Sequence, residues 1–80
     1  MMTAEQLRAA RGLLRWSQSA AARHASISVE TIKRLERMTG PLTRVHVETI
    51  EALREAFEAA GVEFIDPNGG GPGVRLRDPA

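Results

Sequence analysis

The chain has no cysteine, no tyrosine, and only one tryptophan and two phenylalanines among its 80 residues. Without cysteine it has no disulfide framework and no thiolate metal site, and His24 and His46 are too few to form a zinc cluster. No apolar run is as long as a membrane span or a secretory h-region, so we expect a cytoplasmic protein. We expect no cofactor, no small-molecule ligand and no enzymatic activity, because no activated nucleophile, metal cluster or ligand-binding domain can be assembled.

The shortness of the chain limits its stability. A domain of this length buries only about 60% of the surface of its unfolded chain, so a partner subunit would help. The glycine-rich run from Asp66 to Gly73 does not read as a phosphate-binding loop, because no Lys-Ser or Lys-Thr follows it and no helix begins after it. The run is a turn.

The net charge is only +1, but the charges divide the chain into two halves. Residues 1–44 hold eight Lys and Arg against three Glu, a net +5, whereas residues 45–80 hold three Arg against seven Asp and Glu, a net −4. A basic run is often only a solvated face. A basic half is, however, also what a phosphate-binding surface requires.

Two short helices joined by a tight turn are predicted between Gln18 and Arg37. The first runs from Gln18 to about His24 and the second from Val29 to about Arg37, with Ser17 and Ser28 as their N-caps. Small and aliphatic residues fall where the two helices would press together: Ala21, Ala22, Ala25, Ile27, Ile32 and Leu35. The free face of the second helix is polar and mostly basic: Val29, Glu30, Lys33, Arg34 and Arg37.

This stretch resembles the helix-turn-helix of the Cro and lambda-repressor-like (XRE) family. The resemblance is carried by Gln18, the pair Ala21-Ala22, the turn His24-Ala25-Ser26, the step Ile27-Ser28 and the closing Ile32-Lys33-Arg34-Leu35-Glu36. It covers roughly residues 3–60. The family usually has glycine where this chain has Ser26, and a left-handed conformation there costs another residue about 1 kcal/mol.

Two more helices complete a four-helix domain, predicted over residues 1–61. The first should run from Ala4 to Arg15 behind a Thr3–Gln6 capping box, with Arg8, Arg11 and Arg15 on its outer side. Trp16, which follows, is expected in the core rather than stacked on a base. The fourth should be capped by Thr43 and end at Gly61. Its apolar stripe comprises Val45, Val47, Ile50, Leu53, Ala56, Phe57 and Ala60, and its exposed side carries Glu48, Glu51, Glu55 and Glu58.

The remaining residues, 62–80, change to a period of two. Residues 62–65 and 74–77 alternate between apolar and charged around the glycine-rich turn, which predicts two short antiparallel strands. Val62 and Phe64 should share one face with Val74 and Leu76, and Glu63 should face Arg75. We expect this hairpin to be the dimer element. The alternative is that it folds back on its own helices and the dimer forms through the acidic fourth helix.

The fold class is therefore mainly α, a four-helix lambda-repressor-like domain with a C-terminal two-stranded antiparallel β-hairpin. The resemblance implies a sequence-specific DNA-binding transcriptional regulator, a Cro-like repressor or an activator, that binds double-stranded DNA as a homodimer on a palindromic site. It places Ser28, Val29, Glu30 and Arg34 at base edges. Contacts to the DNA backbone are expected from Arg15, Gln18, Arg23, Thr31, Lys33, Arg37 and Arg44.

A second hypothesis comes from another class. The helix-turn-helix could be the scaffold of a protein-interaction module, an antitoxin-like or adaptor protein, whose acidic helix or hairpin holds another regulatory protein. The basic half favours DNA binding, because an adaptor does not need it. A simpler interpretation of the exposed face of the second helix is that Glu30 and Arg34, four residues apart, form a surface ion pair and have no role in binding.

Overall fold

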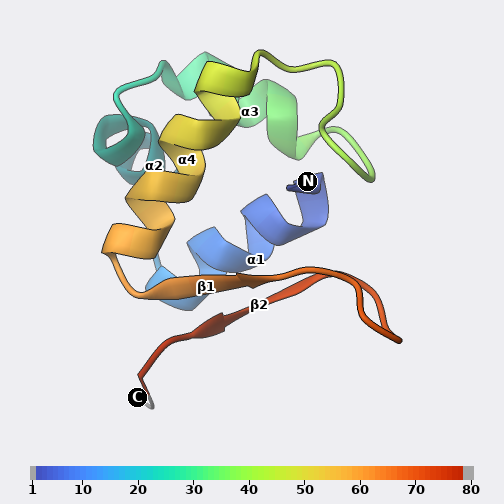
Figure 1. The fold of residues 1–80 in the computed structure, drawn as a ribbon. Coiled ribbons are helices and arrows are strands. Elements are labelled where there is room, and N and C mark those ends of the chain that lie inside the picture. Colours follow the sequence, from blue (N-terminus) through green and yellow to red (C-terminus); the bar gives the residue numbers. More distant parts are fainter. Residues whose placement is uncertain (1, 79–80) are drawn as a thin grey trace.

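Four helices and a two-stranded hairpin make up the computed structural model of the protein, which describes residues 2–78 (Figure 1). In chain order the elements are α1 (Ala4–Leu14), α2 (Gln18–Ala25), α3 (Val29–Glu36), α4 (Val47–Ala59), β1 (Val62–Ile65) and β2 (Gly73–Leu76). The predicted fold class is confirmed. The last two residues of the predicted hairpin segment, 79 and 80, lie outside the described residues.

Side-chain caps begin the first three helices, as predicted. Thr3 and Gln6 form a reciprocal capping box at α1, with Gln6 N–H donating to the Thr3 hydroxyl over 3.0 Å and Thr3 N–H donating to Gln6 Oε1 over 2.9 Å. Ser17 accepts the N–H of Ala20 at α2, and Ser28 that of Thr31 at α3. These caps satisfy N–H groups that the helices themselves leave unpaired.

The start of α4 differs from the prediction. The helix begins at Val47, and Thr43 does not cap it; His46 is the N-cap and makes no side-chain capping bond. The preceding loop is held against the N-terminus of α1, because Leu42 N–H donates to the Met2 carbonyl and Pro41 bridges to Thr3. The chain therefore has to turn at residues 43–45 before a helix can form.

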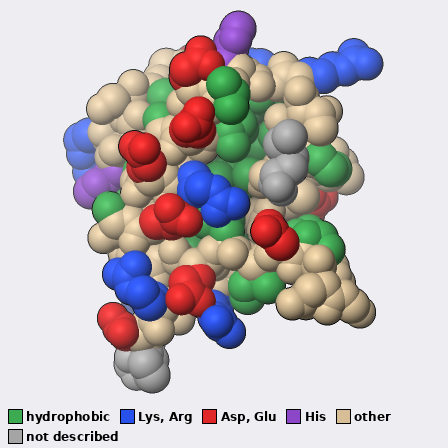
Figure 2. Space-filling model, in the orientation of Figure 1, with side chains coloured by type: hydrophobic (Ala, Val, Ile, Leu, Met, Phe, Trp, Pro, Cys, Tyr) green, Lys and Arg blue, Asp and Glu red, His purple; other side chains and the backbone are tan. Residues whose placement is uncertain are grey.

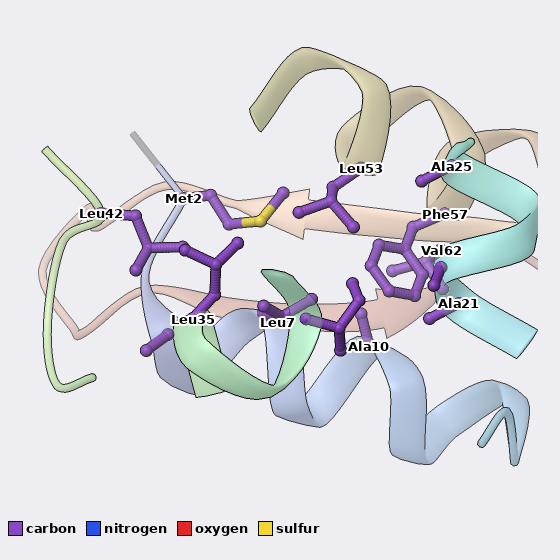
Figure 3. Close-up of a cluster of buried hydrophobic side chains, with 13 residues drawn as sticks. Met2, Leu7, Ala10, Ala21, Ala25, Leu35, Leu42, Leu53, Phe57 and Val62 are labelled. Carbon is purple, nitrogen blue, oxygen red and sulfur yellow. The ribbon is translucent and has the colours of Figure 1, made fainter. Parts of the chain in front are cut away.

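One hydrophobic core joins the helices to the hairpin. Its fully buried large side chains come from every helix except the alanine-rich α2, and from the N-terminus, the α3–α4 loop and β1: Met2, Leu7, Ile32, Leu35, Leu42, Leu53, Phe57 and Val62 (Figure 3). The alanines of α2 let its backbone approach this core closely. The predicted stripe of α4 holds at Leu53 and Phe57 but not at its ends. Val47, the first residue of α4, is 62% exposed, and Ala60, which follows its last residue, is also exposed.

The hairpin covers α1 and α4 (Figure 1). Its register pairs Val62 with Leu76, Glu63 with Arg75 and Phe64 with Val74, so the predicted apolar face is confirmed and packs inward. The predicted charge pair is also present, with 2.7 Å between Arg75 Nε and Glu63 Oε1. The hairpin thus folds back on its own helices. Whether it also takes part in a dimer stays a prediction.

A buried glutamine fixes the hairpin to the first helix. The Gln6 amide nitrogen donates to the carbonyl of Ile65 over 3.3 Å and to that of Gly73 over 2.9 Å, at the turn end of the two strands. The same side chain forms the capping box through its oxygen, so all of its polar atoms are used although the residue is only 3% exposed. A single side chain therefore connects the start of the chain to its last strand.

A residue in the left-handed conformation ends each of the first two helices, at the α1–α2 turn and at the α2–α3 turn. Ser26 ends α2 with φ 57°, the conformation expected where the family has glycine, and Arg15 ends α1 with φ 56°. Trp16, next to Arg15, is half-buried, so its predicted core position is confirmed in part. Its ring stacks on His24 with centroids 4.1 Å apart and on Phe57 at 5.5 Å. These stacks attach the α1–α2 turn to α4.

Candidate nucleic-acid interface

Helix α3 has one buried face and one open face. Ile32 and Leu35 are fully buried against the other helices. On the opposite side Glu30, Lys33 and Arg34 are exposed. A short helix with one side in the core and a continuous polar side in solvent can enter a DNA groove without unfolding.

The four predicted base-reading residues extend from the N-cap of α3, Ser28, to its last turn, where Arg34 lies. Ser28 and Arg34 are exposed, Val29 is half-buried, and the Glu30 side chain is 80% exposed. The carboxylate of Glu30 lies 3.8 Å from Lys33 Nζ and does not pair with Arg34. The Glu30–Arg34 surface pair considered from the sequence is therefore not formed. Arg34 keeps its guanidinium free of any carboxylate among residues 2–78. Their roles at base edges stay predictions.

The four arginines predicted to contact the DNA backbone are all exposed. Exposed arginines without an ion pair to any described residue come from the α1–α2 turn, from α2, from the end of α3 and from the loop that follows: Arg15, Arg23, Arg37 and Arg44. Thr31 is half-buried and its hydroxyl bonds to that of Ser28 at 2.9 Å. Free guanidinium groups of this kind can neutralise phosphates at no cost in broken protein contacts.

Gln18 differs from the expectation in its orientation. It lies at the start of α2 as predicted, but its amide nitrogen donates to Glu36 Oε1 over 3.2 Å instead of pointing freely outward. The residue is half-buried. A nearby carboxylate attracts the amide inward, so a contact from Gln18 to a phosphate stays a prediction that must share this side chain with Glu36.

A partly buried ion pair joins α1 to the end of α3, and its arginine, Arg11, does not lie on the outer side of α1 as predicted. Arg11 holds Glu36 through two bonds, Nε to Oε2 at 2.6 Å and the second nitrogen to Oε1 at 2.9 Å. The side chains are only 26% and 7% exposed. Such a bidentate pair between α1 and the end of α3 fixes the orientation of α3.

The titration of Glu36 reflects this environment. Burial alone would raise its pKa, but the hydrogen bonds from Arg11 and Gln18 and the charges of Arg11 and Arg8 outweigh burial and lower the pKa below its ordinary value. Arg8 also donates to the carbonyls of Glu36 and Met38 at the C-terminal end of α3, at 2.6 and 3.2 Å. Two of the arginines of α1 thus hold α3 in place. The sequence feature that could have predicted this ion pair is Glu36, the acidic residue that ends the Ile-x-x-Leu-Glu motif.

The arrangement defines a helix-turn-helix: two short capped helices, a left-handed turn and an open face on the second helix. A family model described as a helix-turn-helix domain matches residues 4–64. The chain therefore belongs to this family of helix-turn-helix domains, in agreement with the Cro and lambda-repressor-like resemblance, and its membership suggests a DNA-binding regulator. Comparison with curated proteins gives no match.

The helices of the described part of the chain, residues 2–78, are all too short or too polar to cross a membrane.

Proposed function

We propose that the protein is a sequence-specific DNA-binding transcriptional regulator that works as a homodimer, with α3 in the major groove of a palindromic operator. The observation that carries the proposal is the open face of α3, together with exposed arginines in and next to the helix-turn-helix that have no ion-pair partner among the described residues. In a protein with a net charge of only +1, this concentration of free cations on one motif suits a polyanion.

Base recognition falls to the exposed residues of the first two turns of α3. Arg34 can form the bidentate contact to guanine, Glu30 can accept from a cytosine amino group, and Val29 can pack on a thymine methyl. Lys33 and the surrounding arginines then fix the helix on phosphates. The 3.8 Å pair between Glu30 and Lys33 is weak and exposed, so its loss on binding costs little.

The free edge of β2 supports the proposed dimer. Arg77 N–H donates to the Gly61 carbonyl, so in the alternation of an antiparallel pair the backbone groups of Val74 and Leu76 point away from β1. Among residues 2–78 no further strand pairs with the outer edge of β2 (Figure 1). Pairing this edge with its counterpart across a two-fold axis would give a four-stranded sheet and two α3 helices related by the same symmetry. Successive major grooves require those helices to lie about 34 Å apart.

The salt dependence of DNA binding tests the proposal. If each subunit engages about three to five phosphates, a dimer should show a log–log slope of roughly −5 to −9 between affinity and salt concentration. A selection from a random DNA pool should return an inverted repeat. A flat salt response, or no duplex binding at low salt, would favour the protein-interaction module instead.

The dimer element can be tested without deleting the hairpin, which contributes Val62 to the core. Val74→Pro removes an edge N–H that makes no bond to β1, while Val74→Ala removes a similar amount of packing and keeps that N–H. We expect light scattering to find the alanine variant dimeric and the proline variant monomeric. Equal dimerisation of both variants would show that the β2 edge is not the interface.

A further inference from the structure

An apolar hollow lies at the start of α4, and its lining does not include any residue assigned to the DNA interface, although Arg44 lies between two of the lining residues in the sequence. It has a volume of about 160 Å³ and is lined by Leu42, Thr43, Val45, Val47 and Ile50. Val47 is the most exposed large hydrophobic residue of the described chain, at 62%, and Leu13 on α1 follows at 39%. Single exposed apolar side chains are common, but an exposed valine at the rim of an apolar hollow is a potential contact for another side chain.

A row of carboxylates borders the hollow along α4. Glu48, Glu51 and Glu55 are exposed, and none forms an ion pair within residues 2–78, whereas Glu58 pairs with Arg54. Figure 2 shows acidic side chains gathered on the face that carries α4, with apolar side chains beside the upper ones. The surface therefore combines an apolar depression with unneutralised negative charge.

These two properties restrict what can bind. DNA is repelled by the carboxylates. A second copy that met this face symmetrically would bring two rows of glutamates together, which is unfavourable. The fourth-helix dimer considered from the sequence is disfavoured on the same ground. An apolar side chain flanked by lysines or arginines fits both the hollow and the row.

We propose that this surface, Leu42, Val45, Val47 and Ile50 with Glu48, Glu51 and Glu55, binds a basic amphipathic helix of a partner protein. One aliphatic side chain of that helix fills the hollow and its basic residues face the carboxylates, the usual way in which an amphipathic helix binds a groove. This function goes beyond DNA binding and does not depend on it. The regulator would then carry a DNA-reading half and a protein-binding half.

The test uses the full chain and a fluorescent model peptide of about 14 residues, with leucines at helical spacing and lysines elsewhere. A peptide with the same pattern and glutamate in place of lysine is the control. We expect the Leu/Lys peptide alone to bind, with amide shifts in the ¹⁵N spectrum concentrated in residues 42–55. Binding without localised shifts, equal binding of both peptides, or no binding would overturn the proposal.

Matched variants locate the contact. Val47→Ser should weaken peptide binding about fivefold, because it removes the apolar contact at the rim, while Leu13→Ser should leave binding unchanged. Both residues are exposed, so both variants should fold. Equal losses from the two variants would show nonspecific attraction. Concentration-dependent shifts around Val47 in the free protein would show instead that a second copy occupies the surface. DNA affinity, measured on the same samples, reports separately on the proposed function.

Discussion

The two halves of the chain use their cations differently. In residues 45–80 every arginine is engaged: Arg54 with Glu58, Arg75 with Glu63, and Arg77 with the Glu58 carbonyl at the end of α4. In residues 1–44 only the arginines of α1 are engaged in this way, and those on and around α2 and α3 remain free. Charge in the second half therefore holds structure together, whereas much of the charge in the first half is left available for a ligand.

The helix starts show the same division. α1, α2 and α3 each begin with a side-chain cap, and α4 begins at His46 without one. The two eight-residue helices of the motif are too short to be stable alone. Besides the buried Ile32 and Leu35, they depend on caps and on the Arg11–Glu36 pair, while the 13-residue α4 begins without a side-chain cap and is held by its packing in the core. Helices α2 and α3 thus need polar contacts in addition to packing, whereas the start of α4 does without a side-chain cap.

The largest expected effect is a difference in the stability that two ion pairs contribute, the partly buried Arg11–Glu36 pair and the exposed Arg75–Glu63 pair. Glu36→Gln should lower the free energy of unfolding by about 2–4 kcal/mol, because it leaves the partly buried Arg11 without its counter-charge. Glu63→Gln, the same substitution in the exposed pair with Arg75, should cost at most about 1 kcal/mol. Urea unfolding at neutral pH measures both. Similar losses would contradict the proposed difference between the halves.

The same pair makes stability depend on pH. The folded-state pKa of Glu36 is lowered, so its contribution is complete above the unfolded value of about 4.3 and is lost as the pH falls through the lower folded value. Wild type should therefore lose stability below about pH 4.5, and its advantage over Glu36→Gln should shrink there. An advantage that stays constant down to pH 3 would mean that folding does not lower the pKa of Glu36.

The next effect concerns DNA affinity. Arg34→Ala should weaken binding to the preferred site by about 1–3 kcal/mol and relax the choice of one base pair, because this guanidinium lies on the open face of α3. Arg23→Ala should weaken all sequences alike, and Arg75→Ala, in the acidic half, should change nothing. Titrations of specific and random duplexes distinguish these outcomes. A loss at Arg75 equal to that at Arg34 would place the DNA elsewhere.

A smaller gain is expected at the start of α4. His46→Asp supplies the missing cap and a negative charge near the helix N-terminus, which together should raise the free energy of unfolding by about 1 kcal/mol. Ser17→Ala in the motif should lower it by a similar amount. Thermal unfolding of the two variants measures the gain from adding a cap to α4 and the loss from removing the cap of α2. No gain at residue 46 would indicate that the first turn of α4 is fixed entirely by the loop.

The smallest effect tests the turn of the motif. Ser26→Gly relieves the left-handed conformation at φ 57° and should stabilise the protein by about 0.5 kcal/mol, the remainder after the higher entropy of glycine in the unfolded chain. Ser19→Gly, at an exposed position inside α2, should destabilise it by about 0.5–1 kcal/mol. Thermal melts of both variants provide the comparison. A loss at both positions would mean that Ser26 is not strained.

Local signals were sufficient for most of the fold. The caps at Thr3, Ser17 and Ser28 act over three residues, and the hairpin register follows from alternation, so each could be predicted from neighbouring letters. Contacts across the chain could not. That Glu36 would hold both Arg11 and Gln18, and that Val47 would project past the core, depends on how the helices pack, which no local pattern encodes.

The Gln6 side chain, which bonds to backbone groups 59 and 67 residues away, has a consequence for synthesis on the ribosome. Helix α1 emerges before residues 62–76, which supply both the carbonyls that bond to the Gln6 amide and the strands that cover Phe57. A nascent chain that contains all four helices but not the hairpin therefore still exposes the apolar faces of α1 and α4 that the hairpin covers. We expect the folded helix-turn-helix to assemble only after residues 62–76 have emerged, as one cooperative step, so a nascent chain that stops before residue 62 would be a substrate for proteases and not a partial regulator.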